Sequence, residues 1–287
     1  MKEITEFGSR NMVPGSLVQM LTLAKYVFLD FFRSRRFFIR LTIALAVGAL
    51  LTGIVDYYRP GGFLSSVLQF YYNWWGQTAP LIIVLSAVFF GGDAISGEFQ
   101  NKTGYFLVGN PIRRSVIYLG KWIAAFCASL IVLLIFALVA VSNGVYYFGA
   151  TVPIEFWEAL AFSVLYLASA MGLTFFFSSV FKSNSMSILV TVILLIFVFS
   201  VVQTFVASLA KTEPWFILTY GAQIISNVLQ SPYPSPVQTG VQSIGAARGF
   251  SITSYSASIP EGIAIMLIYF LVATVGGLLL FERKEFS

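Results

Sequence analysis

The sequence has few charged residues, no histidine and a single cysteine. Charged residues occupy 10% of its 287 positions, whereas soluble domains average about 25%, so a soluble globular protein is excluded. Because histidine is absent, zinc proteases, Ser-His-Asp hydrolases and His-ligated haem proteins are excluded, and most general-base chemistry at neutral pH lacks its usual side chain. Cys127 lies alone in an apolar run, which excludes an intrachain disulfide and a cysteine-based metal site.

Hydrophobic residues, in contrast, make up 58% of the chain and form long runs. A helix needs roughly 20 predominantly apolar residues to cross a bilayer. Six segments meet this requirement: about 37–55, 74–92, 123–141, 157–177, 187–207 and 263–280. They predict an all-α polytopic membrane protein, with residues 1–36 preceding a six-span domain at 37–287. Pro80 lies inside the second predicted span, where a kink is expected.

The basic residues predict how the spans are oriented. The first fifteen residues are charged and have no apolar core, so we see no cleavable signal and expect a cytoplasmic N-terminus. Of the 17 Lys and Arg residues, only Arg59, Lys211 and Arg248 then fall on the outer side. We expect a multi-pass protein of the plasma membrane with both termini in the cytoplasm. The net charge of +5 is this orientation signal, and no nucleic-acid partner is expected.

The predicted spans are nearly free of ionisable groups, which bears on the energy source. Arg40 lies about one turn into the first span, from where it can extend to the inner surface. A charge at the membrane centre costs at least ~2.5–3.5 kcal/mol and usually marks an ion path, and none is present. An ion-coupled transporter is therefore disfavoured. Gly120-Lys121 also lacks the other residues of a phosphate-binding loop, so we expect no nucleotide or other cofactor on this chain.

An amphipathic stretch precedes the first span. Between Ser16 and Arg36, apolar residues recur at helical spacing after a break at Pro14-Gly15. We expect a helix along the inner membrane surface that turns into the first span at the "RSRR" cluster. The residues that we assign to this helix are Lys25, Phe28, Arg33, Arg35 and Arg36. The alternative is an ordinary interfacial anchor.

The inner segment at 93–118, between the second and third spans, is polar but has an apolar stretch at Tyr105–Val108. Asn110-Pro111 follows as a turn signal. This pattern predicts a short amphipathic helix and a turn that protrude from the membrane and can dock on a partner. For the charged residues Glu98, Arg113 and Arg114, the alternative is solvated surface charge or contact with lipid headgroups.

Four short motifs in and after this segment resemble a known family. They are Ile95-Ser-Gly-Glu98, Lys102-Thr103, Asn110-Pro-Ile-Arg113 and Leu119-Gly-Lys121. Their order after the second of six spans resembles the permease subunits of type-2 ABC exporters, and the amphipathic helix is similar to that family's elbow helix. The family often has a second acid where Gln100 stands and a glycine where Lys102 stands.

The resemblance implies a fold and a mechanism. Two six-span subunits, identical or paralogous, pair side by side, and each docks on a cytoplasmic ATPase subunit that binds ATP and Mg. A coupling helix at Tyr105–Asn110, braced by Glu98 and by Arg113 or Arg114, passes motion to the spans. The residues assigned to coupling are Glu98, Tyr105, Phe106, Leu107, Asn110, Pro111, Arg113 and Arg114, with Lys182 in the loop between spans four and five.

The outer segment at 208–260 separates spans five and six. Trp215–Leu229 has apolar residues at helical spacing but is too interrupted to span a membrane. Family members carry short re-entrant helices here, so the resemblance implies an outer gate with Trp215, Ile217, Leu218 and Ile225. The alternative is an interfacial helix that seals the subunit edge. The Ser/Pro-rich stretch that follows is either flexible or a contact site for an outer-side substrate-binding or accessory protein.

The favoured function is thus the permease subunit of an ATP-driven exporter. One alternative is a membrane anchor or sensor that has the permease architecture and transports nothing. Another is an intramembrane enzyme, which needs paired carboxylates or histidine at membrane depth, and these are absent. The 29 phenylalanines do not identify a substrate, because phenylalanine in spans mostly faces lipid or packs between helices.

Overall fold

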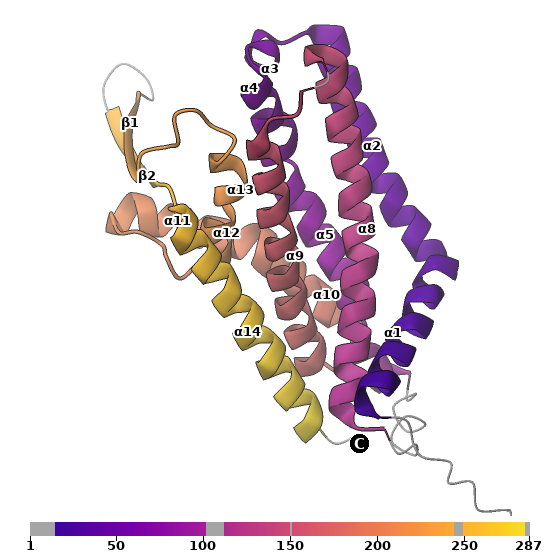
Figure 1. Ribbon diagram of the computed structural model, residues 1–287. Helices are drawn as coiled ribbons and strands as arrows, with labels where there is room; N and C mark the ends of the chain where they lie inside the picture. The colour runs from indigo at the N-terminus through magenta and orange to yellow at the C-terminus, as the bar shows by residue number, and fades with distance from the viewer. Residues whose placement is uncertain (1–14, 102–111, 150, 244–248, 285–287) are drawn as a thin grey trace, which may run out of the picture.

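The computed structural model describes residues 15–101, 112–149, 151–243 and 249–284. Figure 1 shows a bundle of long helices, with short helices at its upper end and, beside its upper part on the left, further short helices and a β-hairpin. The chain is 80% helical, and six of its helical segments are long and apolar enough to cross a membrane. The predicted all-α polytopic fold with six spans is confirmed.

The spans are longer than the ranges predicted from sequence, and each predicted range lies inside one of them. The first is α2 (Arg35–Tyr58), the third α8 (Arg114–Phe148), the fourth α9 (Ile154–Val180) and the sixth α14 (Ile259–Arg283). The second comprises α4 (Val67–Tyr71), a π-helical turn (Tyr72–Gly76) and α5 (Ala79–Gly91), and continues to Gln100. The fifth comprises α10 (Asn184–Val192), α11 (Phe199–Phe205) and π-helical turns at Ile193–Val198 and Val206–Ala210.

Pro80 does not kink the interior of a helix. The chain turns at residues 77–78, and α5 begins at Ala79, so Pro80 lies in its first turn. A missing N–H costs nothing at that position, because the first turn of a helix has no intrahelical acceptor for it. The irregular stretch just before it is held by Trp74 and Trp75, which are fully buried and lie 4.9 and 5.7 Å from the ring of Phe136 in α8.

Spans two, three and four form the core of the bundle. In their most apolar windows, 61, 50 and 56% of the residues are buried, compared with 22, 17 and 22% in spans one, five and six. In Figure 1, α8 and α9 accordingly lie at the centre, with α2 and α14 at the periphery. The peripheral spans therefore present broad apolar faces to lipid or to another chain.

Close packing between α9 and α14 depends on small residues. A Cβ atom at Gly172 of α9 would lie 2.7 Å from Thr274 Oγ1 of α14, and one at Gly277 of α14 would lie 3.0 Å from Phe176 Cα of α9. Ser169 Oγ also donates a hydrogen bond of 2.7 Å to the carbonyl of Met266. Such small residues let the two backbones approach closely.

The amphipathic segment forms a separate helix, α1 (Ser16–Arg33), which ends at Ser34, where the backbone is extended. It packs on the start of α8, since a Cβ atom at Gly120 would lie 2.9 Å from Leu23 Cδ2. Leu17 and Leu21, one turn apart, are 71 and 59% exposed. An exposed apolar stripe is what a helix in contact with a membrane surface needs, although its position along that surface stays a prediction.

The other end of the bundle carries the short elements. They are α3 (Gly61–Leu64), α12 (Leu218–Ala222), α13 (Ile224–Asn227), β1 (Val237–Ser243) and β2 (Gly249–Tyr255). The two strands pair antiparallel, with Val237 opposite Tyr255 and Ser243 opposite Gly249. This hairpin was not predicted. We call this the outer end, and the end where α8 begins and α14 ends the inner end, after the orientation that the basic residues predict.

Candidate functional site

At the inner end, the second span finishes in a five-residue helix, α6 (Ser96–Gln100). Two glycines allow close packing there, next to the turn at residues 92–95 between α5 and α6. A Cβ atom at Gly91 would lie 2.9 Å from Met171 Sδ in α9, and one at Gly92 would lie 2.6 Å from Ile188 Cγ1 in α10. Only glycine allows both approaches without displacing a neighbour. As a result, α6 is placed directly against the ends of several spans. We call α6 and its polar partners from those spans the α6 junction.

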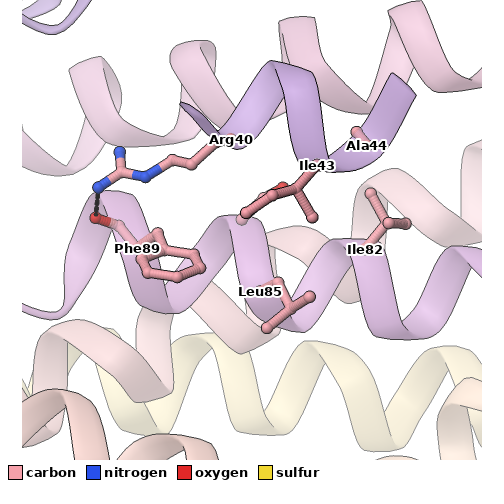
Figure 2. A pocket seen from close by; sticks show the side chains of 7 residues that line it. Arg40, Ile43, Ala44, Ile82, Leu85 and Phe89 are labelled. Carbon is pink, nitrogen blue, oxygen red and sulfur yellow. Dashed lines mark hydrogen bonds between the residues drawn. The ribbon is translucent and has the colours of Figure 1, made fainter. Parts of the chain in front are cut away.

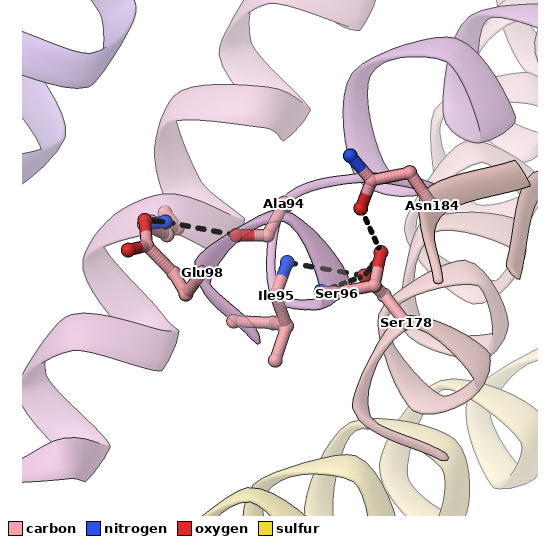
Figure 3. A network of polar contacts seen from close by, with 7 residues as sticks. Ala94, Ile95, Ser96, Glu98, Ser178 and Asn184 are labelled. Atoms are coloured by element: carbon pink, nitrogen blue, oxygen red, sulfur yellow. Dashed lines mark hydrogen bonds and ion pairs between the residues drawn. The ribbon is translucent and has the colours of Figure 1, made fainter. Parts of the chain in front are cut away.

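The first turn of α6 is capped by α9 rather than by its own sequence. The backbone N–H groups of Ile95 and Ser96 both donate to Ser178 Oγ, at 3.0 Å each (Figure 3). Ser96 and Ser178 are 0% exposed. Buried N–H groups at the start of a helix need an acceptor, so this single hydroxyl fixes α6 to the end of the fourth span.

The same helix also contacts the first residue of α10. Ser96 Oγ donates to Asn184 Oδ1 at 2.8 Å, as Figure 3 shows. Gln100 Oε1 accepts a hydrogen bond of 2.8 Å from the backbone N–H of Asn184. Ser96 and Gln100 are four residues apart and therefore share one face of the helix. The start of the fifth span is thus bonded to both ends of α6.

Another face of α6 carries an ion pair with α8. The carboxylate of Glu98 pairs with the ammonium group of Lys121, which also donates to the carbonyl of Ala94 at 2.8 Å (Figure 3). The two side chains are only 15 and 13% exposed. Glu98 and Arg113 or Arg114 were expected to brace the two ends of the coupling helix, which lies outside the described residues, so that brace stays a prediction; the described ion-pair partner of Glu98 is Lys121. Lys121 stood in the sequence motif but was assigned no role.

The sixth span reaches α6 through Lys284, the residue after α14. Its ammonium group lies 4.3 Å from the ring centroid of Phe99 in α6. It also donates to the carbonyls of Ser179, Val180 and Phe181, at 2.9, 3.1 and 3.2 Å. A cation is stabilised at the end of a helix, where carbonyls lack intrahelical partners. Burial, and secondly the charge of Lys182, lower the pKa of Lys284.

Arg114 performs a related task at the end of α14. Its Nη1 donates to the carbonyls of Glu282 and Lys284 at 2.9 and 2.7 Å. It therefore fixes the start of the third span to the end of the sixth. Neither this contact nor the one made by Lys284 could be predicted from the spacing of the residues, because the partners are backbone carbonyls of distant helices.

The other predicted site residues are distributed as follows. Arg113 precedes α8 and is exposed, as is Lys182 between α9 and α10. Lys25, Arg33 and Arg35 are exposed, and Phe28 is half-buried. Tyr105, Phe106, Leu107, Asn110 and Pro111 lie outside the described residues, as does the side chain of Arg36. Of the residues assigned to coupling, the structure therefore brings Glu98 and Arg114 into the inner polar contacts. In the described ranges, no three His, Cys, Asp or Glu side chains are grouped as a metal site would require.

A family model described as "ABC-2 family transporter protein" matches residues 21–286. The chain belongs to the ABC-2 transporter family. It is therefore a multi-pass membrane protein and the permease subunit of an ABC transporter, a transport subunit that is not itself catalytic, and an ABC ATPase subunit is implied as its partner. No protein of curated function matches the chain.

At the outer end of this ABC-2 permease, the expected gate helix is two short helices, α12 and α13. Trp215 precedes them and is 64% exposed, whereas Ile217, Leu218 and Ile225 are buried. The segment is packed into the bundle, since a Cβ atom at Gly221 would lie 3.0 Å from Ile265 of α14. The segment Trp215–Leu229 thus contains short helices, as the resemblance implied, and whether they are re-entrant in the membrane stays a prediction. Gating by this segment stays a prediction.

Arg40 of the permease does not extend to the inner surface as expected. It is 8% exposed, and its Nη2 donates to the carbonyl of Phe89 at 2.5 Å (Figure 2). Its guanidinium lies 4.0 Å from the ring centroid of Phe90. The carbonyl and the aromatic face together stabilise the cation in place of water. Arg40 therefore joins the first span to the second, just above the α6 junction.

Proposed function

We propose that this ABC-2 permease is an exporter subunit that forms the translocation path with a second permease chain, identical or paralogous. A cytoplasmic ABC ATPase binds and hydrolyses ATP, and it docks on the inner segment that follows the second span. The α6 junction passes the resulting motion to the spans. The chain itself supplies the path and the lever, and it binds no nucleotide or other cofactor.

The observation that carries this proposal is the position of α6. It ends at Gln100, directly before the segment in which the sequence places the coupling helix. Its side chains and backbone contact α8 through Lys121, α9 through Ser178, α10 through Asn184, and the end of α14 through Lys284. Because all four contacts lie within or beside the short helix α6, a displacement of the loop is passed to four spans at once.

The energy source follows from what the described spans contain. The buried charged groups that the structure describes lie near the inner end, where they hold helices together, and none lies halfway along a span. This arrangement supports mechanical coupling to a partner rather than an ion path. The sequence also lacks the glycine-rich loop that cradles phosphates, which supports hydrolysis on a partner chain.

Three further parts complete the proposal. α1 acts as an elbow helix on the inner membrane surface, with its exposed leucines toward lipid. α12 and α13, together with Trp215, form an outer gate beside the sixth span. The hairpin of β1 and β2 is a contact site for an outer-side substrate-binding or accessory protein. Both termini lie in the cytoplasm.

The experiment that tests the assembly is purification of the tagged chain from its native membrane, followed by native mass spectrometry. We expect a complex with two permease chains and ATPase subunits. A complex with one permease chain would overturn the proposed pairing. Purification without any ATPase subunit, under conditions that keep other membrane complexes intact, would count against the ATP-driven function.

A further inference from the structure

The first turn of α10 is joined to α6 through one residue. Asn184 accepts from Ser96 Oγ with its side chain and donates from its backbone to Gln100 Oε1, both at 2.8 Å. The side-chain amide and the backbone N–H are thus bonded to two points on α6 that are one turn apart. Two bonds to two points fix both the position and the orientation of the start of α10, which a single bond does not.

Because little of the fifth span is buried, its position depends more strongly on the contact at Asn184 than the position of a well-buried span depends on any single contact. Only 17% of its most apolar window is buried, compared with 61% for the second span. It is also interrupted by π-helical turns at Ile193–Val198 and Val206–Ala210, a rare conformation that is often found at functional sites. In the described ranges, the side-chain hydrogen bonds that join α10 to another helix are the two at Asn184.

An ordinary capping role does not account for this arrangement. The N-cap residue of α10 is Ser183, and its side chain makes no capping hydrogen bond. The acceptor for the exposed N–H of Asn184 comes instead from α6, which is 84 residues away in the sequence. An N-cap side chain accepts from the second or third residue of a helix, so Ser183 does not reach the N–H of Asn184, and the acceptor from α6 links two distant segments rather than replacing a local cap.

We propose that Asn184 is a positioning residue that passes nucleotide-driven displacement of α6 to the fifth span. This inference rests on the proposed function, because it needs an ATPase partner that moves α6. The start of the fifth span packs on its neighbours through apolar contacts such as that of Ile188 on Gly92, and its polar contacts with α6 are made by Asn184, through which it follows α6. The second and fourth spans are held by their own packing and move as part of the core.

The test is hydrogen–deuterium exchange on the purified complex of the full chain with its ATPase subunit, with and without a non-hydrolysable ATP analogue and Mg²⁺. The variants are Asn184→Ala, which removes the acceptor for Ser96, and Gln100→Ala, which removes the acceptor for the Asn184 N–H. Gln100 is exposed, so its replacement carries little risk to folding. Ser185→Ala, on the exposed neighbour of Asn184, is the matched control.

In the wild type and in Ser185→Ala, we expect the analogue to change exchange in both 96–100 and 184–192. In Asn184→Ala and Gln100→Ala, the change at 96–100 should remain, while more than half of the change at 184–192 is lost. A full change at 184–192 in both variants would overturn the role of Asn184 and leave the proposed function intact. If the variants instead exchange faster than the wild type at 184–192, by the same amount with and without nucleotide, Asn184 has a merely structural role. That result would also overturn the proposed positioning role. No change at 96–100 in the wild type would contradict the proposed function itself, and the inference with it.

Discussion

The ion pair between Glu98 and Lys121 offers a quantitative test of the α6 junction. Lys121→Met removes the charge and keeps most of the side-chain length, and Glu98→Gln removes the opposite charge and keeps the shape. If the pair holds α6 against α8, both changes should destabilise the permease. The double variant should then be less destabilised than the sum of the two single variants, because the second change removes a charge that has already lost its partner.

The structure sets the expected size of the effect. Exposed ion pairs contribute ~0.2–1 kcal/mol, whereas removing one partner of a fully buried pair costs ~3–5 kcal/mol. Glu98 and Lys121 are 15 and 13% exposed, which is closer to the buried case. However, Lys121 keeps the carbonyl of Ala94 as an acceptor, and Glu98 has further interactions. We therefore expect a cost of about 2 kcal/mol for each single variant and a coupling energy of about 1 kcal/mol.

The assay is denaturant unfolding of the purified permease in detergent micelles, for the wild type, both single variants and the double variant. Glu158→Gln is the control, because Glu158 is an exposed acid in the first turns of α9, and it should change the free energy of unfolding by less than about 0.5 kcal/mol. Additive effects of Glu98→Gln and Lys121→Met would refute the reasoning, since they would show that the two side chains do not stabilise each other.

Three other changes test separate parts of the account. Phe106→Ala should weaken binding of the ATPase subunit by ~2 kcal/mol or more, as loss of a buried aromatic anchor does, whereas Lys102→Ala should change this binding little. A binding titration measures both variants. Equal effects of the two changes would contradict a coupling helix at Tyr105–Asn110. Gly277→Ala should cost ~1–3 kcal/mol of unfolding free energy through overpacking, because the new Cβ atom meets Tyr118 of α8 and the backbone of Phe176 in α9. Gly53→Ala, with nothing within 4 Å of the new Cβ atom, should cost nothing, and thermal unfolding of both variants checks this. Arg40→Lys should lose about 1 kcal/mol because an ammonium group cannot reproduce the planar stacking on Phe90, and a wild-type melting temperature would contradict that.

The spans could be predicted from sequence because the requirement for roughly 20 apolar residues is local and strong. Their ends could not, because they are set by contacts at the bundle ends. α8 begins at Arg114 since that side chain has carbonyl acceptors at the end of α14. With 35 residues, α8 is about 52 Å long at 1.5 Å per residue, so it extends past the hydrocarbon core at one end or both.

The α6 junction was predictable only in part. Glu98 and Lys121 both stood in the motifs that carry the family resemblance, but nothing in the local sequence indicates that they pair with each other. The bonds from Ser178 and Asn184 join segments more than 80 residues apart, and a serine or asparagine at a loop gives no sign of its distant partner. For Arg40, the sequence shows a charge near a span end but not the aromatic face that stabilises it.

The sequence of the β-hairpin has the alternation that is typical of strands, although its composition is typical of a loop. Val237, Thr239 and Val241 alternate with polar residues, and so do Phe250 and Ile252, which is the period of a strand. The serines, prolines and glycines around them favoured a loop interpretation. At Trp215–Leu229, helical spacing was present, but the chain turns at Gln223, so that α12 and α13 pack on different neighbours.

The measurement that tests the central claim most directly is ATP hydrolysis by the purified chain alone and by its complex with the ATPase subunit, reconstituted in the same lipid. The account predicts no hydrolysis above background for the chain alone and turnover when the ATPase subunit is added. It also predicts that Asn184→Ala in the complex leaves ATPase binding intact. Robust hydrolysis by the chain alone would contradict the claim that this permease is driven by a partner through the α6 junction.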